Sequence, residues 1–359
     1  MKILAVISNH GLGHLAQAAP VLNALSDLHP DLELTVWSGI PLEILRSRIE
    51  PLFEHRHSIA DIGLLMHDAM RVDLAASHAE YQAFHTDWPQ RVRLEADWMH
   101  SQKFACVFSD VAYLPLAAAA QAGIRRVAMC SLNWADIAQA YLADMPGMAS
   151  ILREINDAYA TATVFLQPTP AMPMSALNNR IQIPAIAALG RNNRLRLLQK
   201  FALAATAKLV LIGFGGVAYR QEGTLPRIDN LVWLVPDDWL VGEMVTRNDV
   251  ISFSRTELEF IDLMASADVI ITKVGYGSFV EACAHAVPVI YLDRPDWPET
   301  PYLASWLAEH GNAVAIDAQS LFSSQLEASL SMLWQQPRKP AIRADGATQA
   351  ARLLLTHQP

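Results

Sequence analysis

Short β-rich runs recur along this chain, and each is followed by a polar or glycine-containing loop. The first run, Lys2 to Ile7, ends at Ser8-Asn9-His10-Gly11, and a helical pattern follows from Leu15 to Leu28 before the next run, Leu32 to Trp37. The same order returns in the second half, around the run Val269 to Thr272. Strands that alternate with helices pair in parallel through right-handed crossovers. We therefore expect an α/β protein with a doubly wound parallel sheet in each half.

The length and the punctuation of the chain point to two domains. A chain of 359 residues is too long for one ordinary core and suits two domains of the usual size. Prolines gather between Gln167 and Pro184, and this stretch is the best linker candidate. We place an N-terminal domain at 1–168 and a C-terminal domain at 169–344, with a final helix within 345–359.

The composition excludes several classes of protein. The net charge is −9 and no dense basic run is present, which argues against nucleic-acid binding. The first residues lack the pattern of a signal peptide, and no apolar stretch is long enough to span a bilayer, although peripheral membrane contact stays open. The three cysteines form no metal-binding or paired spacing, nor do the histidines. We expect a cytoplasmic protein without a metal site.

The most informative segment runs from Val269 to Glu281. A buried strand leads into Gly275-Tyr276-Gly277, and a helix is expected to open at Ser278. Glycines allow close backbone approach, and a helix start favours an anion such as a phosphate. Ser278 with Glu281 fits a capping box, so a helix cap is one role for the glutamate. Binding the two hydroxyls of a ribose is the other role, because a carboxylate can accept both hydrogens.

A second glycine loop follows the first strand. Gly11, Gly13 and Ala16 fit the pattern G-x-G-x-x-G/A, which alone is a weak dinucleotide signal. The next strand ends at Val36-Trp37-Ser38-Gly39 without the acid that a nicotinamide cofactor requires at its ribose. His14 closes the loop, and a neutral imidazole suits proton abstraction near neutral pH. A histidine that caps the helix or faces solvent is the alternative.

The chain resembles a known family over these segments. Gly275 to Ile290 followed by Asp293 to Ala304 looks like the donor-binding signature of GT-B glycosyltransferases, including MurG-like N-acetylglucosaminyltransferases and UDP-glycosyltransferases. It is also similar to the glycosyltransferase-like N-terminal domain of arabinokinase-type proteins. The resemblance implies a GT-B fold, in which two Rossmann-like domains face a cleft. It places the acceptor on the N-terminal domain and the donor on the C-terminal domain, with the final helix packed back on the former.

By this resemblance Glu281 holds the ribose of the donor, while Asp296, Glu299 and Thr300 contact its sugar. The loop after Lys208 to Ile212 faces the diphosphate, although a plain tight turn is the alternative there. Lys273 stands where many members have a neutral residue, and we expect a solvated lysine rather than a phosphate contact. The implied donor-binding residues are Gly215, Gly216, Gly275, Gly277, Ser278, Glu281, Asp296, Glu299 and Thr300.

His14 matches the histidine of a Gly-x-Gly-His pattern in the same families, where it acts as a base. Asp110, which follows the strand Cys106 to Phe108, is the candidate that orients it, and His10, Gly11 and Gly13 complete the acceptor and phosphate loop. The implied reaction is inverting, metal-independent glycosyl transfer from a nucleotide-diphosphate sugar, expected to be a UDP-sugar, to a hydroxyl acceptor. No cofactor is needed. A nucleotide-sugar 2-epimerase of the same fold and a non-catalytic nucleotide-sugar-binding protein remain the alternatives.

Overall fold

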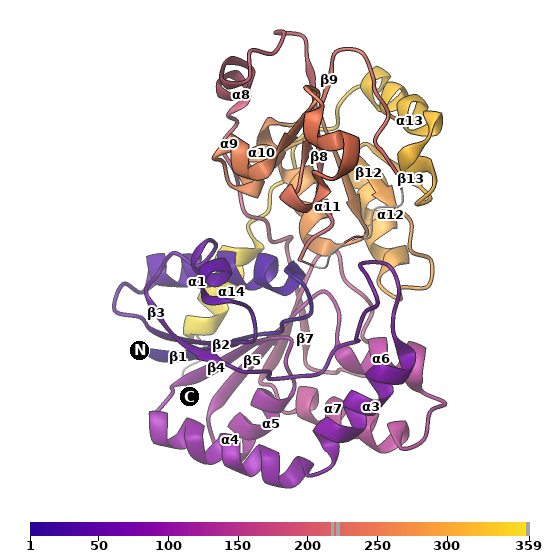
Figure 1. Cartoon of the computed structure of the whole chain (residues 1–359). Coiled ribbons are helices and arrows are strands. Elements are labelled where there is room, and N and C mark those ends of the chain that lie inside the picture. The colour runs from indigo at the N-terminus through magenta and orange to yellow at the C-terminus, as the bar shows by residue number, and fades with distance from the viewer. Residues whose placement is uncertain (217–218, 220–222, 357–359) are drawn as a thin grey trace. The chain divides into compact units, whose positions relative to one another are not determined.

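The computed structural model describes residues 1–216, 219 and 223–356 and divides into two compact units (Figure 1). The first unit contains Met1–His67, Arg71–Ile186 and Ala344–Pro359, and the second contains Asp68–Met70 and Ala187–Arg343. Each unit is built on one parallel sheet, as the alternation of strands and helices predicts. In the part of the chain that the structure describes, no helix combines the length and apolar character needed to cross a bilayer.

The first unit contains a seven-stranded sheet in the order β3-β2-β1-β4-β5-β6-β7. Its central strands are buried from end to end because both faces of the sheet are covered by helices. Its strands are β1 (Lys2–Ile7), β2 (Glu33–Ser38), β3 (Phe53–His57), β4 (Cys106–Asp110), β5 (Arg125–Met129), β6 (Val164–Pro168) and β7 (Arg180–Ile183).

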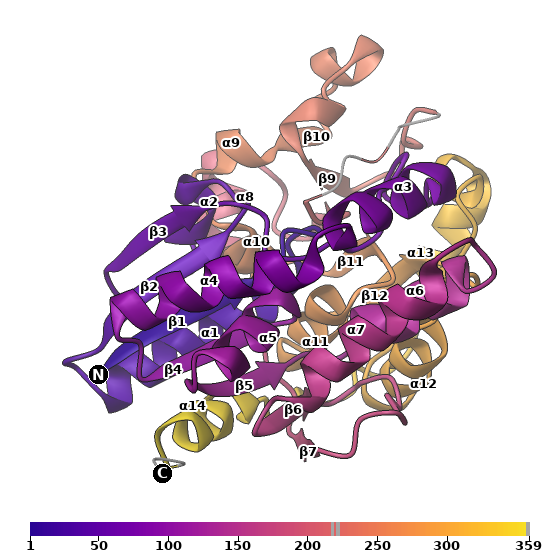
Figure 2. The same cartoon turned by 90° about the horizontal axis from the view of Figure 1, so that it is seen from below.

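Helices cover both faces of this sheet. Figure 1 shows α1 and α14 on one face, where they pack together. Seen from below in Figure 2, α4, α5 and α7 lie in front of the other face, and α5 packs against both of its neighbours. The helices are α1 (Gly13–Leu28), α2 (Leu42–Arg46), α3 (Leu74–His85), α4 (Trp88–Gln102), α5 (Leu114–Gln121), α6 (Trp134–Leu142), α7 (Met148–Ala160) and α14 (Gly346–Thr356).

The second unit contains a six-stranded parallel sheet in the order β10-β9-β8-β11-β12-β13. The strands are β8 (Lys208–Ile212), β9 (Leu231–Val235), β10 (Val250–Ser252), β11 (Val269–Lys273), β12 (Val289–Leu292) and β13 (Ala313–Ile316). The α-helices are α8 (Arg194–Lys200), α9 (Phe253–Thr256), α10 (Phe260–Ser266), α11 (Tyr276–Ala284), α12 (Thr300–His310) and α13 (Ser324–Gln335). Three short 3-10 helices are η1 (Asp237–Trp239), η2 (Gly242–Thr246) and η3 (Ser320–Phe322).

The direction in which strands are added reverses once in each sheet. In the first unit the reversal falls between β1 and β4, and in the second it falls between β8 and β11. The loops that leave two such strands diverge to opposite faces of the sheet and leave a crevice at the carboxyl edge, where doubly wound proteins bind ligands. Both glycine loops singled out in the sequence follow a strand at one of these reversals.

The expected linker is wrong. The proline-rich stretch belongs to the first unit, where Arg180–Ile183 pairs in parallel with β6 as the edge strand β7. The amide of Thr169 donates to the carbonyl of Ile183 at 3.0 Å, and that of Met172 donates to Ser131 at 2.8 Å. The first unit therefore continues to Ile186 instead of ending at residue 168. Prolines are tolerated beside edge strands, so they mark the rim of this sheet and not a domain boundary.

The final helix, α14, lies in the first unit and packs against α1. The guanidinium group of Arg125, at the start of β5, donates hydrogen bonds to the carbonyl oxygens of Leu353 and Leu354 at 2.9 and 2.6 Å. These carbonyls lie in the last turn of the helix, where they lack partners within the helix and where a cation is favourable. The chain thus returns to its first domain after completing the second sheet.

Candidate functional site

The loop after β1 turns sharply into α1. Gly11 has a φ of 75°, a left-handed conformation that suits glycine, and its amide donates to the carbonyl of Asn9 at 2.9 Å. Helix α1 begins at Gly13, and its N-cap residue, Leu12, forms no side-chain cap. A Cβ atom added to Gly13 would meet nothing within 4 Å. The space beside Gly13 at the start of α1 is therefore open, and a helix start of this kind suits an anion.

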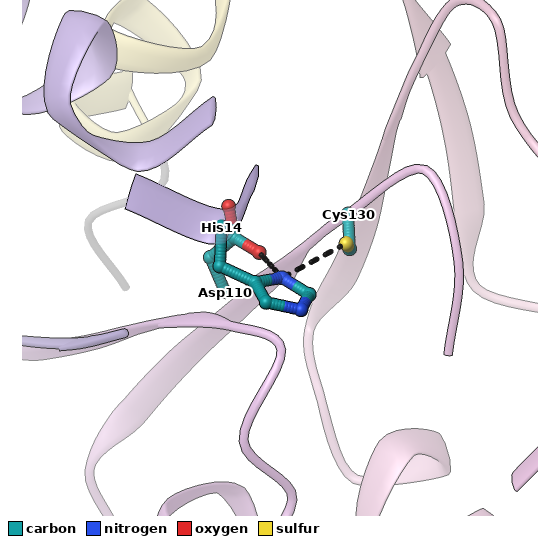
Figure 3. Close-up of side chains that lie close together, drawn as sticks. All are labelled: His14, Asp110 and Cys130. Carbon is teal, nitrogen blue, oxygen red and sulfur yellow. Dashed lines mark hydrogen bonds and ion pairs between the residues drawn. The ribbon is translucent and has the colours of Figure 1, made fainter. Parts of the chain in front are cut away.

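His14 and Asp110 lie together at the carboxyl edge of the first sheet. Asp110 is the last residue of β4, paired with Ile7 of β1, and not the first residue of a following loop as expected. The Nδ1 atom of His14 lies 3.0 Å from Oδ1 of Asp110 (Figure 3), and the two residues are 5% and 0% exposed. The contact between a loop histidine and an orienting aspartate, proposed from the sequence, is therefore present. His14 neither caps its helix nor faces solvent.

The hydrogen bond between His14 and Asp110 determines which ring nitrogen of His14 can act as a base. An ionised Asp110 only accepts hydrogen bonds, so beside it Nδ1 of His14 carries the hydrogen and Nε2 carries the lone pair. Burial raises the pKa of Asp110, whereas the hydrogen bond and the charge of His14 oppose that rise, as does the nearby Cys130. A protonated imidazole and an ionised Asp110 thus stabilise each other.

Cys130, directly after β5, was not predicted to belong to this site. Its Sγ atom lies 3.6 Å from Nδ1 of His14, and Gln17 of α1 holds the same segment through the hydroxyl group of Ser131 at 3.2 Å. Among the described residues, His14, Asp110 and Cys130 are the one group of possible metal ligands close enough together, with their ligand atoms within 4.8 Å of one another. The 3.0 Å separation of His14 and Asp110 is a hydrogen bond, and it requires no ion.

A second layer of aromatic and acidic side chains supports the two loop histidines. The ring of Trp134 lies 5.0 Å from that of His10 and 5.5 Å from that of His14. The indole Nε1 of Trp134 donates to Oδ2 of Asp61 at 2.6 Å. Asp61 lies in the connection between β3 and α3, well before α3 begins at Leu74. No spacing in the sequence connects these residues, because they come from three separate connections of the sheet.

In the second unit, α11 starts earlier than predicted. Gly275 is its N-cap residue, without a side-chain cap, and Tyr276 is its first residue. Ser278 is therefore not an N-cap, and the proposed capping box with Glu281 is wrong. Glu281 lies inside the helix and is only 3% exposed. With the capping role excluded, binding of ribose hydroxyl groups is the role that remains of the two inferred from the sequence.

The loop after β8 lies at the same edge of the sheet as the start of α11. β8 and β11 are neighbours, with Ile212 opposite Ile271, and the amide of Gly213 donates to the carbonyl of Ile271 at 2.9 Å. Gly215 has a φ of 77°, and it and Gly216 are exposed. The structure thus brings Gly215 and Gly216 to the edge that also carries Gly275 and Gly277, and backbone amides of such loops bind anions.

The loop between β12 and α12 holds the three residues expected at the donor sugar. The side chain of Asp296 is 55% exposed, whereas Glu299 and Thr300 are buried. Oε2 of Glu299 accepts a hydrogen bond from the indole of Trp297 at 3.4 Å. The hydroxyl group of Thr300 donates to the carbonyl oxygen of Arg294 at 2.7 Å, so its hydrogen stabilises the loop itself. Of the three side chains, only that of Asp296 is exposed.

Two cations at this edge complete the second unit's site. Lys273 ends β11 and is half-buried, so the expectation of a solvated lysine is wrong. Burial and then the charge of Arg294 lower the pKa of Lys273 to about 8, while Glu299 opposes the shift. Arg294 is 5% exposed, and its guanidinium group lies 4.3 Å from the centre of the Trp297 ring. Arg294 lies within the segment Asp293 to Ala304 that carries the family resemblance, but that resemblance assigned it no role.

Comparisons with known proteins agree with this architecture. Residues 242–357 match the glycosyltransferase family 28 C-terminal domain. The chain is 26% identical over 327 residues to L-arabinokinase of Arabidopsis thaliana, a match that covers 89% of this chain and 31% of that protein. The chain thus spans about a third of the length of this curated relative.

Solved structures share the fold of the whole chain. The glycotransferase of kitacinnamycin superposes with a TM-score of 0.65 at 13% identity, covering 100% of this chain and 99% of that one. UDP-GlcNAc 2-epimerase from Methanocaldococcus jannaschii superposes with a TM-score of 0.57 at 11% identity, covering 99% of each chain. The chain therefore has a GT-B fold, and its residues 242–357 match the C-terminal domain of glycosyltransferase family 28.

Proposed function

We propose that this protein transfers a sugar from a nucleotide-diphosphate sugar, expected to be a UDP-sugar, to a hydroxyl group of an acceptor. The observation that carries the proposal is the buried hydrogen bond between His14 and Asp110, at the reversal point of the first sheet. A hydroxyl oxygen is a weak nucleophile until its proton is removed, and an imidazole oriented by a carboxylate performs that task.

In the proposed reaction, Nε2 of His14 accepts the proton of the acceptor hydroxyl group. The hydroxyl oxygen forms a bond to the anomeric carbon of the sugar, and the bond from that carbon to the diphosphate breaks on the opposite face. The electron pair of the broken bond leaves with the diphosphate, and the configuration at the anomeric carbon inverts. Asp110 keeps the imidazole in its working tautomer and stabilises the imidazolium ion that forms.

The second unit supplies the donor contacts in this proposal. Glu281 accepts hydrogen bonds from the ribose hydroxyl groups, while the start of α11 and the amides of Gly215 and Gly216 bind the diphosphate. Lys273 adds positive charge at the same edge of the sheet. These groups stabilise the departing diphosphate in place of a metal ion, and no cofactor other than the donor takes part. Turnover by this route requires the donor on the second unit to meet the acceptor on the first.

A nucleotide-sugar 2-epimerase is the second candidate, because UDP-GlcNAc 2-epimerases are among the structural neighbours. At 14% and 11% identity these neighbours share the fold alone. Epimerisation inverts a carbon of the sugar without an acceptor, so its products differ from those of transfer. A protein that binds a nucleotide sugar without turnover is the third candidate, and it predicts binding with no product.

The test begins with the thermal stability of the purified chain in the presence of UDP-, TDP- and GDP-sugars. A ligand that binds the folded state at about 100 times its Kd adds about 2.7 kcal/mol of stability, which identifies the nucleotide. The stabilising sugar is then incubated with pooled hydroxyl acceptors, and the products are followed by NMR. Release of the nucleotide diphosphate with a new glycoside supports transfer. An epimerised nucleotide sugar or unchanged donor contradicts it.

A further inference from the structure

A second carboxylate, Asp61, lies buried near the His14–Asp110 pair. It is 2% exposed and belongs to the connection between β3 and α3, whereas Asp110 ends β4. Its Oδ2 atom accepts the hydrogen bond from the indole of Trp134 at 2.6 Å. A carboxylate held this far from water carries a large desolvation cost, and a site that retains one usually depends on its charge or its hydrogen bonds.

Trp134 connects this carboxylate to the two histidines of the loop after β1. Its ring meets that of His10 edge to face, with an interplanar angle of 75°, and that of His14 at 59°. Its backbone amide donates to the hydroxyl group of Tyr159 at 3.2 Å, so the residue is fixed at the main chain as well as at the indole nitrogen. A fully buried tryptophan cannot stack on a ligand, but it can determine where its neighbours lie.

The main chain beside Asp61 is packed directly against the same rings. A Cβ atom added to Gly63 would lie 2.8 Å from Cη2 of Trp134 and 3.2 Å from Cδ2 of His10. These distances are too short for a side chain, so only glycine lets the backbone approach this closely. Segment 61–63 therefore holds Trp134 at the indole nitrogen and at the ring edge together.

We propose that Asp61 and Trp134 are positioning residues, which hold the imidazole rings of His10 and His14 and place a second negative charge beside His14. This inference rests on the proposed function, in which His14 gains a proton during the reaction. Trp134 fixes the orientation of the rings, and Asp61 stabilises the imidazolium form of His14 in addition to Asp110.

The electrostatic part depends on the groups that face His14. Asp110 approaches from β4, Asp61 from the connection after β3, Cys130 from the end of β5, and His10 from the loop of His14 itself. Burial raises the pKa of Asp61, while the hydroxyl group of Ser8, the charge of His14 and the indole of Trp134 lower it. The attraction is mutual, so removing Asp61 weakens the protonated form of His14.

The first test uses Asp61→Asn, which keeps the size of the side chain and removes its charge. The probe is the imidazole C–H resonance of His14 in isotopically labelled full-length protein, titrated from pH 5 to pH 9 without any substrate. We expect the titration midpoint of His14 to fall by about one pH unit, as the loss of one nearby charge produces. Asp97→Asn, at an exposed position on α4, is the matched control and leaves the midpoint unchanged.

If Asp61→Asn is folded and its His14 titrates at the same midpoint as in the wild type, the electrostatic part of the proposal is overturned. Because this measurement needs no turnover, it is separate from the success or failure of the proposed glycosyl transfer. A protein that transfers no sugar would leave the expected shift of His14 intact.

The second test uses Trp134→Phe, which keeps a ring and keeps Asp61 but removes the indole N–H. We expect kcat to fall about tenfold at an unchanged KM for the donor, because a misplaced base slows proton transfer without affecting donor binding. A residue that only stabilises the fold would change the thermal midpoint and leave kcat per folded molecule unchanged, and that result overturns the positioning role. This variant also keeps the proposal testable if Asp61→Asn does not fold.

Discussion

Replacing Glu281 by alanine tests the donor side of the proposal. The glutamate is 3% exposed inside α11, and in the proposed complex both carboxylate oxygens accept ribose hydroxyl hydrogens. A hydrogen bond to a charged group contributes about 1.5–3 kcal/mol, and water that enters the vacated space recovers part of it. We therefore expect a net loss of about 3 kcal/mol, which weakens nucleotide binding roughly 150-fold at 25 °C.

The measurement is isothermal titration calorimetry with the nucleotide diphosphate of the donor that stabilises the wild type. Glu281→Gln keeps the volume and one acceptor oxygen, so its affinity should fall by about tenfold. Glu327→Ala, at an exposed position on α13, is the matched control and should bind as the wild type does. If Glu281→Ala is folded and binds the nucleotide within about twofold of the wild type, the ribose assignment is refuted.

Three further predictions concern packing, charge and metal ions. Gly63→Ala should lower the free energy of unfolding by about 1–3 kcal/mol in urea denaturation, because its Cβ atom would overlap Trp134. Gly13→Ala is the control, because its Cβ atom meets nothing within 4 Å. Equal stability of the two variants would contradict the close packing of Gly63 against Trp134. Lys273 has a pKa of about 8 in the folded protein, so between about pH 8 and pH 10.5 the unfolded chain binds more protons and stability rises with pH. Urea titrations of the wild type should show this rise relative to Lys273→Met, and a fall would contradict it. Turnover should survive EDTA, measured as nucleotide release; a loss that Mg²⁺ restores would rule out the metal-independent route.

Several strands of both sheets could be predicted from the sequence because each is a short apolar run. Lys2–Ile7 and Lys208–Ile212 have the predicted bounds. The domain boundary could not be predicted in the same way. The edge strand β7 is half-polar and has prolines near it, so its composition resembles that of a linker.

Site residues beside a single glycine loop could be predicted from the sequence, whereas those brought together from several connections could not. His14 and Glu281 lie in helices that directly follow glycine-containing loops, a pattern typical of ligand binding. Asp61, Trp134 and Cys130 come from connections after β3 and β5, and only the parallel order of the sheet brings them beside His14. The start of α11 was misplaced because Gly275 takes the cap in an extended conformation, φ −176°, which any residue can adopt.

The most direct test compares nucleotide binding and turnover in His14→Ala. We predict that the nucleotide Kd stays within about twofold of the wild type, because the proposed donor contacts lie on the second unit. Turnover should fall by about 10²- to 10⁴-fold, the usual contribution of a general base. Asp110→Asn should also lose most of its turnover, since it cannot stabilise the imidazolium ion as a carboxylate does. Turnover of His14→Ala at the rate of the wild type would contradict the assignment of this histidine as the base.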